Sequence, residues 1–290
     1  MKTMTRRTIL ALTAAGLLAP AFPAQAQDSL QARVEAQKVT VGIHNRRPWG
    51  YRDADGNVAG FHPDLVRAAL APLGITEVDF IISDFGALIP GLQAKRFDMI
   101  ASGISVTPER CSQVIFSEPD LSVGDAILVK KGNPKQVFSF EDIKENTDFV
   151  LGGGRGTLNT KDALAAGVPE DRMQQFPGAQ EALSALMAGR VDGNVLSGPT
   201  ATMLLEDPNV GDKLERVTPF TGLMRENGEP VALYTAIAFR PEDTELRDAY
   251  NARLAEMTAE GTVAEIRARY GFTDDEAAPS YTTAEICAGL

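Results

Sequence analysis

Short apolar runs alternate along the chain with segments whose apolar residues recur at helical spacing. Residues 39–43, 78–82 and 97–101 are runs of strand length. Between them, residues 63–73 and 87–93 gather their apolar side chains on one face, as amphipathic helices do. This strand–helix order is typical of half of a doubly wound, mostly parallel sheet. The pattern therefore predicts an α/β fold.

A weak internal repeat follows 94 residues later. Residues 92–98 read LQAKRFD and residues 186–192 read LMAGRVD. In both, an amphipathic segment ends at a basic residue, which suits the end of a helix, and a short strand begins. Junctions between helices and strands resemble one another in many proteins, yet the repeat favours two similar lobes.

Two later apolar runs are candidates for strands that pass between the lobes. We expect residues 126–130 and 234–239 to form this two-strand hinge. The first lobe then holds residues 38–125 together with 240–290, and the second holds residues 131–233. Two lobes on a hinge enclose a cleft that opens and closes.

The N-terminal segment, residues 1–26, has the pattern of a cleaved export signal. Arg6 and Arg7 belong to a basic start, an apolar stretch covers residues 9–22, and residues 24–26 form a small-x-small cleavage site. The paired arginines resemble a twin-arginine signal. A general secretory peptide that happens to carry two arginines is the alternative. Either route predicts a periplasmic protein.

Charge and composition exclude several classes of function. The net charge is −11, and loss of the three basic residues of the signal leaves 25 basic against 39 acidic residues, or −14. A nucleic-acid binder that works by charge is therefore not expected. With two histidines and two cysteines, we expect neither a metal site nor a cofactor. In an oxidising compartment Cys111 and Cys287 are expected to form a disulfide, with two buried free thiols as the alternative.

Enzyme motifs are mostly missing. The chain has no Gly-x-Ser-x-Gly elbow, and the glycine-rich residues 152–157 fit neither the P-loop nor the dinucleotide spacing. These glycines would offer backbone N–H groups to a carboxylate or another small anion. A flexible loop is the alternative interpretation.

The stretch over residues 101–110 is the most informative one. A strand is expected to end at Ala101, and Thr107 and Pro108 open a helix. This arrangement places Arg110 near the carboxyl ends of the strands, where α/β sheets bind ligands. Its guanidinium could hold a carboxylate by two parallel hydrogen bonds. A solvated helix arginine beside Glu109 is the alternative.

This stretch, together with residues 60–65 and 116–119, resembles the family 3 periplasmic solute-binding proteins of ABC importers. These proteins bind polar amino acids and related compounds, and the resemblance covers nearly all of the mature chain. Residues 85–92, 107–111 and 287–289 are most similar to the ectoine/hydroxyectoine-binding branch. The resemblance implies a type II periplasmic binding protein whose two lobes are each a doubly wound sheet.

The resemblance also implies a ligand set drawn from both lobes. Trp49 and Phe85 would supply aromatic walls able to hold a cationic or delocalised group. Alternatively, Trp49 caps the core and Phe85 is the first apolar residue of its helix. The implied ligand-binding residues are Trp49, Phe85, Gly103, Ser105, Arg110, Gly156 and Thr157.

Three positions depart from the related proteins, and two of them extend the candidate site. Ser197 stands where amino-acid binders carry an aspartate for the α-ammonium group. Arg46 stands where the ectoine branch has an acidic residue, and Ser105 where it has an aromatic one. If Arg46 faces the cleft, the site holds two cations and favours a ligand richer in negative charge. Arg47 is the neighbouring alternative, because successive strand residues face opposite sides.

We therefore expect a monomeric binding protein, without catalytic residues, that closes on a small carboxylate-bearing nitrogenous solute. Its partners would be an inner-membrane ABC permease and the ATPase of that permease. The alternative is a periplasmic enzyme on the same scaffold, similar to cyclohexadienyl dehydratase. That enzyme would need an acid or a base in the cleft, for which Asp84, Glu118 and His44 are the candidates.

Overall fold

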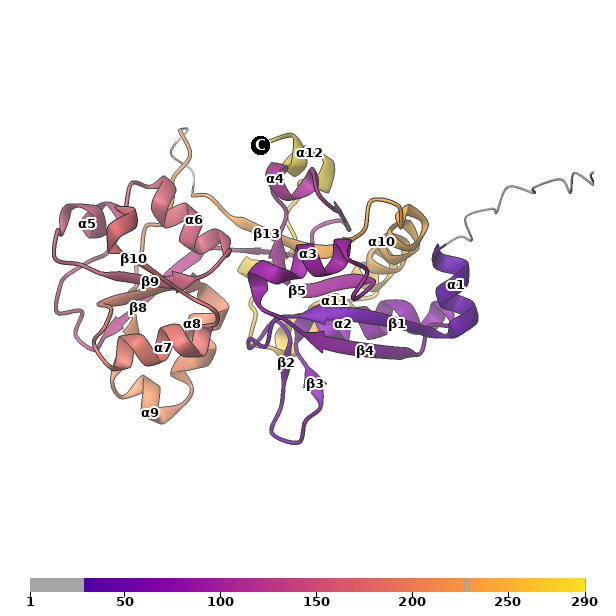
Figure 1. Cartoon of the computed structure of the whole chain (residues 1–290), viewed down its shortest axis with the longest axis horizontal. Coiled ribbons are helices and arrows are strands. Elements are labelled where there is room, and N and C mark those ends of the chain that lie inside the picture. The colour runs from indigo at the N-terminus through magenta and orange to yellow at the C-terminus, as the bar shows by residue number, and fades with distance from the viewer. Residues whose placement is uncertain (1–28, 227, 229, 290) are drawn as a thin grey trace, which may run out of the picture.

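Two β-sheets, each covered by helices on both faces, lie side by side in the molecule (Figure 1). The structure is a computed structural model that describes residues 29–226, 228 and 230–289. The predicted export signal, residues 1–26, lies outside the described residues. Within the described part of the chain, no helix is long and apolar enough to cross a membrane.

The first sheet has the strand order β4-β1-β5-β13-β6, and β7 also pairs with β13. Strand β1 runs parallel to β4 and β5, whereas β13 is antiparallel to β5. The parallel core confirms the predicted strand–helix order. The strands are β1 (Lys38–Ile43), β4 (Glu77–Ile82), β5 (Met99–Ser105), β6 (Ile115–Phe116), β7 (Leu121–Val123) and β13 (Leu233–Phe239).

Helices bury apolar faces on both sides of this sheet. The apolar stripe of α2, which includes Leu65, Ala69 and Leu70, is fully buried in one core cluster, and Ile286 belongs to a second cluster on the opposite side. The first side carries α2 (Phe61–Leu70), α10 (Thr244–Ala259) and α11 (Thr262–Arg269), with α1 (Ser29–Ala36) against α10. The second side carries α3 (Leu88–Gln93), α4 (Pro108–Cys111) and α12 (Thr283–Ala288).

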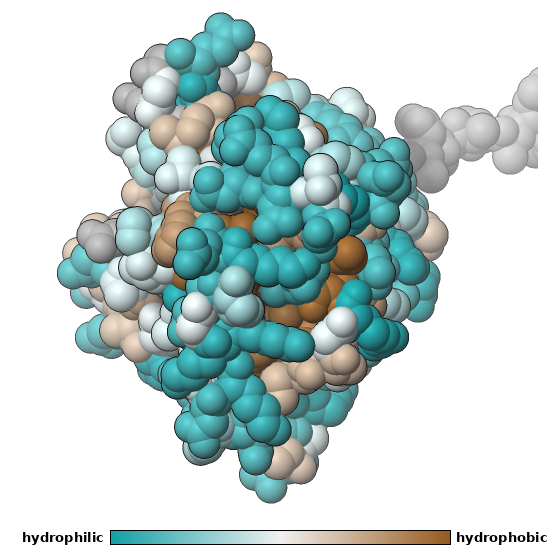
Figure 2. Space-filling view, turned by 90° about the vertical axis from the view of Figure 1, so that its left-hand side faces the viewer, coloured by the Kyte–Doolittle hydropathy of each residue, from teal (hydrophilic) through white to brown (hydrophobic). Residues whose placement is uncertain are grey.

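The second sheet repeats the plan of the first, with the order β10-β9-β11-β8-β12. Strands β10, β9 and β11 are parallel, and β8 is antiparallel to β11. Its strands are β8 (Asp125–Lys130), β9 (Leu151–Gly154), β10 (Met173–Phe176), β11 (Gly193–Ser197) and β12 (Leu214–Arg216). Its helices are α5 (Phe140–Glu145), α6 (Leu158–Ala165), α7 (Ala179–Met187), α8 (Gly198–Leu205) and α9 (Pro208–Gly211). The end of the molecule that this half forms presents mainly hydrophilic side chains (Figure 2).

Smaller elements complete the chain. A two-stranded ribbon pairs β2 with β3 and extends beyond the first sheet. In the part of the chain that the structure describes, four single turns of 3-10 helix join the larger elements. The ribbon strands are β2 (Tyr51–Arg52) and β3 (Val58–Ala59), and the turns are Ala71–Leu73, Phe85–Ala87, Glu170–Arg172 and Asp274–Glu276.

The repeated sequence segments occupy matching places in the two sheets. Asp98 Oδ2 accepts a hydrogen bond from Thr40 N at 2.9 Å, while Asp98 N donates to Thr40 O at 2.7 Å. Asp192 makes the same pair of bonds with Val150, at 2.9 and 2.7 Å. In each lobe an aspartate at the helix–strand junction thus fixes the neighbouring strand, which is the physical basis of the repeat.

Two predicted segments differ from the observed elements. The expected strand over 97–101 continues to residue 105, because β13 pairs with it as far as Ser105 and Thr235. Gly152 and Gly153 are not loop residues but lie in β9, where they pair with residues of β10 and β11.

The two predicted hinge strands are both members of sheets. Residues 126–130 pair with β11 and β12, and residues 234–239 pair with β5, β6 and β7. The chain crosses between the sheets outside these strands, first at Gly124 and then between β12 and β13. Each of these strands therefore lies inside the sheet of the lobe that it enters, with paired strands on both sides. The exact lobe bounds stay a prediction.

A disulfide joins Cys111 to Cys287, as predicted, with the two Cα atoms 5.8 Å apart. It ties α12 to the single turn of α4, two segments that are 176 residues apart in sequence. Both cysteines pack against the core cluster that contains Ile286 and Phe85. The bond therefore fixes the short helix that carries Arg110.

Replacing both cysteines, Cys111→Ser with Cys287→Ser, is expected to lower the free energy of unfolding by roughly 2–5 kcal/mol. The reason is that the unfolded chain regains the entropy that a long closed loop removes. Urea unfolding followed by circular dichroism measures the change. Reductant should destabilise the wild type and leave the double variant unchanged. Equal stability of the two proteins would contradict this role.

Candidate functional site

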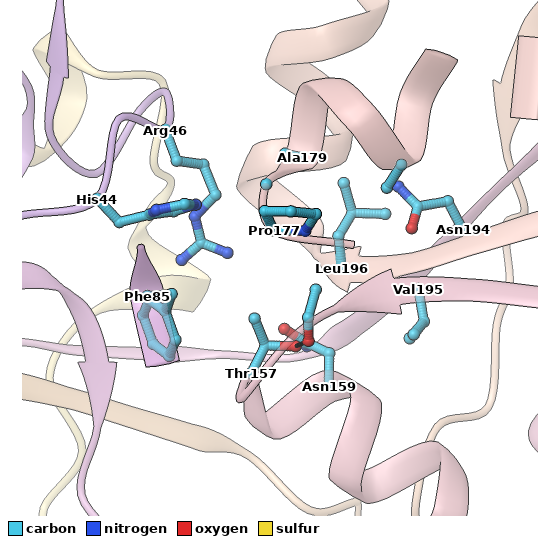
Figure 3. A pocket seen from close by; sticks show the side chains of 13 residues that line it. His44, Arg46, Phe85, Thr157, Asn159, Pro177, Ala179, Asn194, Val195 and Leu196 are labelled. Atoms are coloured by element: carbon cyan, nitrogen blue, oxygen red, sulfur yellow. Dashed lines mark hydrogen bonds between the residues drawn. The ribbon is translucent and has the colours of Figure 1, made fainter. Parts of the chain in front are cut away.

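A cavity lies between the two lobes and draws its walls from both (Figure 3). It consists of two adjoining hollows that share four residues. We call their union the interlobe cavity. The shared residues are Arg46, Phe85, Thr157 and Asn159. The first hollow extends toward His44, Pro177 and Asn194, and the second toward Trp49, Ser105 and Ser197.

Arg46 presents an unpaired guanidinium to this cavity. Its loop is closed by hydrogen bonds in which Arg46 N donates to Gly50 O at 2.9 Å and Gly50 N donates to Arg46 O at 3.1 Å. The side chain is only 9% exposed and points into the cavity (Figure 3). Its Nε is buried without a partner, and within the described residues no hydrogen bond reaches the rest of the guanidinium. Burial lowers the pKa of Arg46 to about 10, so the group is still charged at neutral pH.

The guanidinium of Arg46 lies beside both predicted aromatic walls. Its Cζ is 5.6 Å from the centre of the Trp49 ring and 5.7 Å from that of Phe85. We expected these rings to hold a cationic group of the ligand. In the structure the guanidinium of Arg46 lies beside both rings, and their role toward a ligand stays a prediction.

Arg47 is the arginine that faces away. It is exposed, and its Cζ lies 4.4 Å from the ring centre of Tyr51. The alternation of neighbouring side chains therefore sends Arg46 inward and Arg47 outward. This geometry answers which of the two arginines reaches the cleft.

Arg110 is buried beside the cavity. The side chain is 6% exposed, so the alternative of a solvated helix arginine is wrong. Its Nη1 donates to Ser105 O at 2.8 Å, and its Nη2 donates across the cleft to Gly156 O at 3.0 Å. Burial lowers its pKa to about 10, against the opposing charges of Glu109 and Asp162. These two bonds use two of the five N–H groups of the guanidinium, and the role of Arg110 as a carboxylate ligand stays a prediction.

Phe85 separates the two arginines. The Cζ of Arg110 lies 5.6 Å from the Phe85 ring centre, close to the distance found for Arg46. Arg110 and Gly156 line a hollow that adjoins the interlobe cavity and shares Phe85 with it. All nine predicted ligand residues thus gather in one region between the lobes, although Arg110 and Gly156 lie just outside the cavity itself.

Trp49 and Gly103 are linked by packing. A Cβ at Gly103 would lie 2.5 Å from the Trp49 ring, and the residue has a φ of +63°, so only glycine fits here. The amide of Gly103 donates to His62 Nδ1 at 2.8 Å, which leaves His62 Nε2 to donate to Asp120 Oδ2 at 3.0 Å. Gly103 therefore leaves room for the Trp49 ring. The N–H of Gly103 donates to His62 and is not available to a ligand.

The indole of Trp49 bonds to the opposite lobe. Its Nε1 donates to Thr200 Oγ1 at 3.0 Å and lies 3.4 Å from Ser197 Oγ. The two hydroxyls are also hydrogen-bonded to each other at 2.9 Å. Ser197, which stands where amino-acid binders carry an aspartate, therefore takes part in the contact between the lobes. Trp49 both packs into the core and lines the cavity.

The second lobe adds Thr157 and two asparagines. Thr157 caps α6 by accepting from Thr160 N, and its hydroxyl donates to Gly154 O at 2.9 Å. Asn159, two residues further on, and Asn194, in β11, line the cavity and were not expected. The sequence does carry a signal for Asn194, since an asparagine inside an apolar strand calls for a partner.

The three candidates for acid–base chemistry do not form a catalytic set. His44 lines the cavity, but burial and the neighbouring Arg46 lower its pKa, so it is neutral at neutral pH. Asp84 lies in an exposed outer groove, and Glu118 accepts a hydrogen bond from Thr283 N at 2.9 Å away from the cavity walls. Among the described residues there is also no cluster of three potential metal ligands.

Several known proteins are similar to this chain. The probable amino-acid ABC transporter periplasmic-binding protein y4tE of Sinorhizobium fredii is 36% identical over 253 residues, which are 86% of this chain and 82% of that protein. The ABC transporter arginine-binding protein 1 of Escherichia coli is 30% identical over 237 residues, 80% of this chain and 89% of that protein.

Solved structures have the same architecture. The structure of EhuB in complex with hydroxyectoine has a TM-score of 0.83 and 36% identity, and the match covers 91% of this chain and 99% of that one. The ancestral amino acid-binding protein AncCDT-1, a precursor of cyclohexadienyl dehydratase, has a TM-score of 0.73 and 28% identity, with 83% and 98% covered.

These likenesses confirm the two-lobed type II fold and the predicted resemblance. The two relatives are named as binding proteins of ABC transporters, the first as a probable periplasmic one for amino acids and the second as one for arginine. Residues 39–273 match a single family over most of the chain. The chain belongs to the bacterial extracellular solute-binding proteins of family 3, as the substrate-binding protein of an importer for amino acids or related polar solutes.

Proposed function

We propose that the protein closes on a small solute that carries a carboxylate and an N–H group, and delivers it to an inner-membrane ABC permease. The observation that carries this proposal is the unpaired, buried guanidinium of Arg46. A buried charge without a partner is costly, and a ligand carboxylate would remove that cost by a charge-assisted hydrogen bond. The cavity would therefore favour an anionic group at Arg46.

The solutes named with similar structures fit this chemistry. They are hydroxyectoine, arginine, glutamine and histidine, and each carries a carboxylate together with N–H groups. Asn159, Asn194 and Thr157 supply polar groups opposite Arg46. Ectoine and hydroxyectoine fit less well than the amino acids, because Arg46 replaces an acidic residue and an arginine cannot accept a hydrogen bond from their ring N–H.

Closure would bring residues 38–125 and 240–290 together with residues 131–233. Three contacts across the cleft support this movement: Trp49 Nε1 to Thr200 Oγ1, Arg110 Nη2 to Gly156 O, and Lys161 Nζ to Glu109 Oε2 at 2.5 Å. A ligand between the lobes would add its own bonds to these. We further propose a monomer that is exported to the periplasm, by the twin-arginine route.

A thermal-shift screen identifies the ligand. The probes are hydroxyectoine, ectoine, L-arginine, L-histidine, L-glutamine, an opine and succinate. At a concentration of about 100 Kd, a bound solute stabilises the folded state by roughly 2.7 kcal/mol and raises the melting temperature accordingly. A carboxylate-bearing nitrogenous solute is expected to give the largest shift. The largest shift with succinate, which has carboxylates but no N–H group, would refute the proposal.

Arg46→Met is expected to weaken binding of that solute by about 100-fold, or ~3 kcal/mol, because a buried carboxylate loses its partner. Isothermal titration calorimetry measures the change. Arg47→Met is the matched control, since it removes the adjacent arginine that faces outward, and its affinity should stay within threefold. Equal effects of the two substitutions would remove Arg46 from the ligand site.

The variant Arg110→Met distinguishes the contribution of Arg110 to solute binding from that of Arg46. We expect a smaller loss than for Arg46→Met, because Arg110 already donates to two backbone carbonyls. A larger loss would make Arg110 the principal carboxylate ligand. Both variants are compared with the wild type by thermal unfolding without solute, so that a general loss of stability is recognised.

Trp49 is the one tryptophan of the chain and reports on closure. Its indole bonds to Thr200 across the cleft, so ligand binding is expected to change its emission. Fluorescence titration measures this change, and Trp49→Phe should abolish it. An unchanged spectrum with saturating solute would place Trp49 apart from the moving contact.

The solute should be released unchanged. Of the three candidates, only His44 lines the cavity, as a neutral imidazole that could act as a base, while Asp84 lies outside and supplies no acid beside it. Mass spectrometry of the bound solute after a long incubation is therefore expected to find the original compound alone. A modified product would favour the dehydratase-like alternative.

A further inference from the structure

His44 lies where the interlobe cavity meets the outer groove. It lines both spaces, which also share Pro177, Gly178 and Ala179, and it is only 9% exposed. Figure 3 shows His44 and Arg46 pointing from the first lobe toward the second. A buried polar side chain in the wall of a cavity is a candidate for contact with a ligand.

One ring nitrogen of His44 is already used by the protein. Nδ1 lies 3.2 Å from Ser83 O, and because a backbone carbonyl can only accept a hydrogen bond, Nδ1 carries a proton. Burial and then the charge of Arg46 lower the pKa of His44, so the ring is neutral at neutral pH. The Ser83 backbone and the charges of Asp84 and Glu181 oppose this shift. A neutral imidazole with its proton on Nδ1 has none on Nε2, so Nε2 is a hydrogen-bond acceptor.

The far edge of the imidazole faces the second lobe. A Cβ at Gly178 would lie 3.7 Å from His44 Cε1, the ring carbon that joins the two nitrogens. Gly178 belongs to the walls of both the cavity and the outer groove. Since Nδ1 is bonded to Ser83 of the first lobe, Nε2 is the nitrogen left on the side of the second. Within the described residues no hydrogen bond reaches Nε2, so it is an unused acceptor between the lobes.

The charges on the two sides of His44 have opposite signs. Asp84 from the first lobe and Glu181 from the second line the outer groove, and Glu181 Oε2 would lie 2.6 Å from the same Cβ at Gly178. Arg46 lines the cavity but not the groove. Negative charge attracts the positive hydrogen of an N–H or ammonium group and repels a carboxylate. The groove side of His44 therefore favours the nitrogen end of a ligand, and the Arg46 side favours its carboxylate.

We propose that His44 Nε2 accepts a hydrogen bond from an N–H group of the solute while Arg46 binds the solute carboxylate. His44 then selects solutes that carry an N–H group and orients their nitrogen toward the outer groove. It supplies an acceptor in a site where Ser197 stands in place of the aspartate of amino-acid binders. The contact with a solute rests on the proposed function, whereas the state of the imidazole without solute does not.

The tautomer of His44 in the whole protein without solute is the first test. The chain has two histidines, and His62 is an internal reference because it accepts through Nδ1 and donates through Nε2. Nitrogen-15 magnetic resonance at neutral pH, with each ring assigned from the backbone signals of its residue, distinguishes the two forms. We expect the proton on Nδ1 in His44 and on Nε2 in His62. A proton on Nε2 of His44, in a neutral or a charged ring, would overturn the proposal without any variant.

Two substitutions separate a contact with solute from the contact with Ser83. The amide nitrogen of an asparagine can replace Nδ1, so His44→Asn can keep the bond to Ser83 O but loses the atom at Nε2. The amide of a glutamine reaches the position of Nε2, so His44→Gln can offer an acceptor there. L-arginine, L-histidine, L-glutamine and hydroxyectoine are titrated by calorimetry. Each solute that binds the wild type is expected to bind His44→Asn roughly tenfold more weakly, and His44→Gln should recover most of that loss.

A purely structural role of His44 would give the reverse order of the two variants. Wild-type affinity in His44→Asn, or a loss confined to His44→Gln, would therefore overturn the proposal. Thermal unfolding without solute identifies a variant that has lost its fold, and the tautomer then decides alone. If none of the four solutes binds the wild type, the proposed function is refuted while the tautomer of His44 is unaffected, so the two failures are distinguishable.

Discussion

The structure depends on one buried positive charge that the protein does not neutralise. Arg46 lies between the rings of Trp49 and Phe85, almost fully removed from solvent, with no carboxylate of the described chain bonded to it. Folded proteins rarely leave such a group unpaired, because desolvation of a charge costs several kcal/mol. The cost is removed if a carboxylate of the ligand binds to Arg46, and this pairing is the proposed chemistry of the site.

The remaining contacts prepare the cleft for such a ligand. Gly103 admits the Trp49 ring, His62 and Asp120 fix the backbone beneath it, and the indole reaches the hydroxyls of the second lobe. The disulfide holds the one-turn helix of Arg110 in place. Both lobes thus bring rigid groups to the cavity, so little conformational freedom remains to be lost when a ligand binds.

Local patterns were sufficient to predict much of the fold. Apolar runs and helical spacing predicted the parallel strands, and the repeat at Asp98 and Asp192 identified equivalent junctions because the same backbone bonds recur in both lobes. The disulfide followed from the number of cysteines and the export signal. The crossing points between the lobes were harder to predict, since an apolar strand looks the same in sequence whether it crosses between two sheets or lies inside one.

The sequence was sufficient to predict which residues lie at the site, but not what most of them contact there. Neighbouring Arg46 and Arg47 are equivalent in sequence, and only the fold of their loop decides which is buried. Gly103 and Ser197 lie at the cleft as expected, but they serve Trp49. Asp125 and Asn159 are 34 residues apart, and their contact depends on packing between β8 and α6 that no local pattern reveals.

A crystal structure of the protein with the solute that gives the largest thermal shift tests the central claim most directly. The account predicts a ligand carboxylate within hydrogen-bonding distance of the Arg46 guanidinium, inside closed lobes. A carboxylate bound elsewhere, with Arg46 still unpaired or turned to solvent, would contradict it.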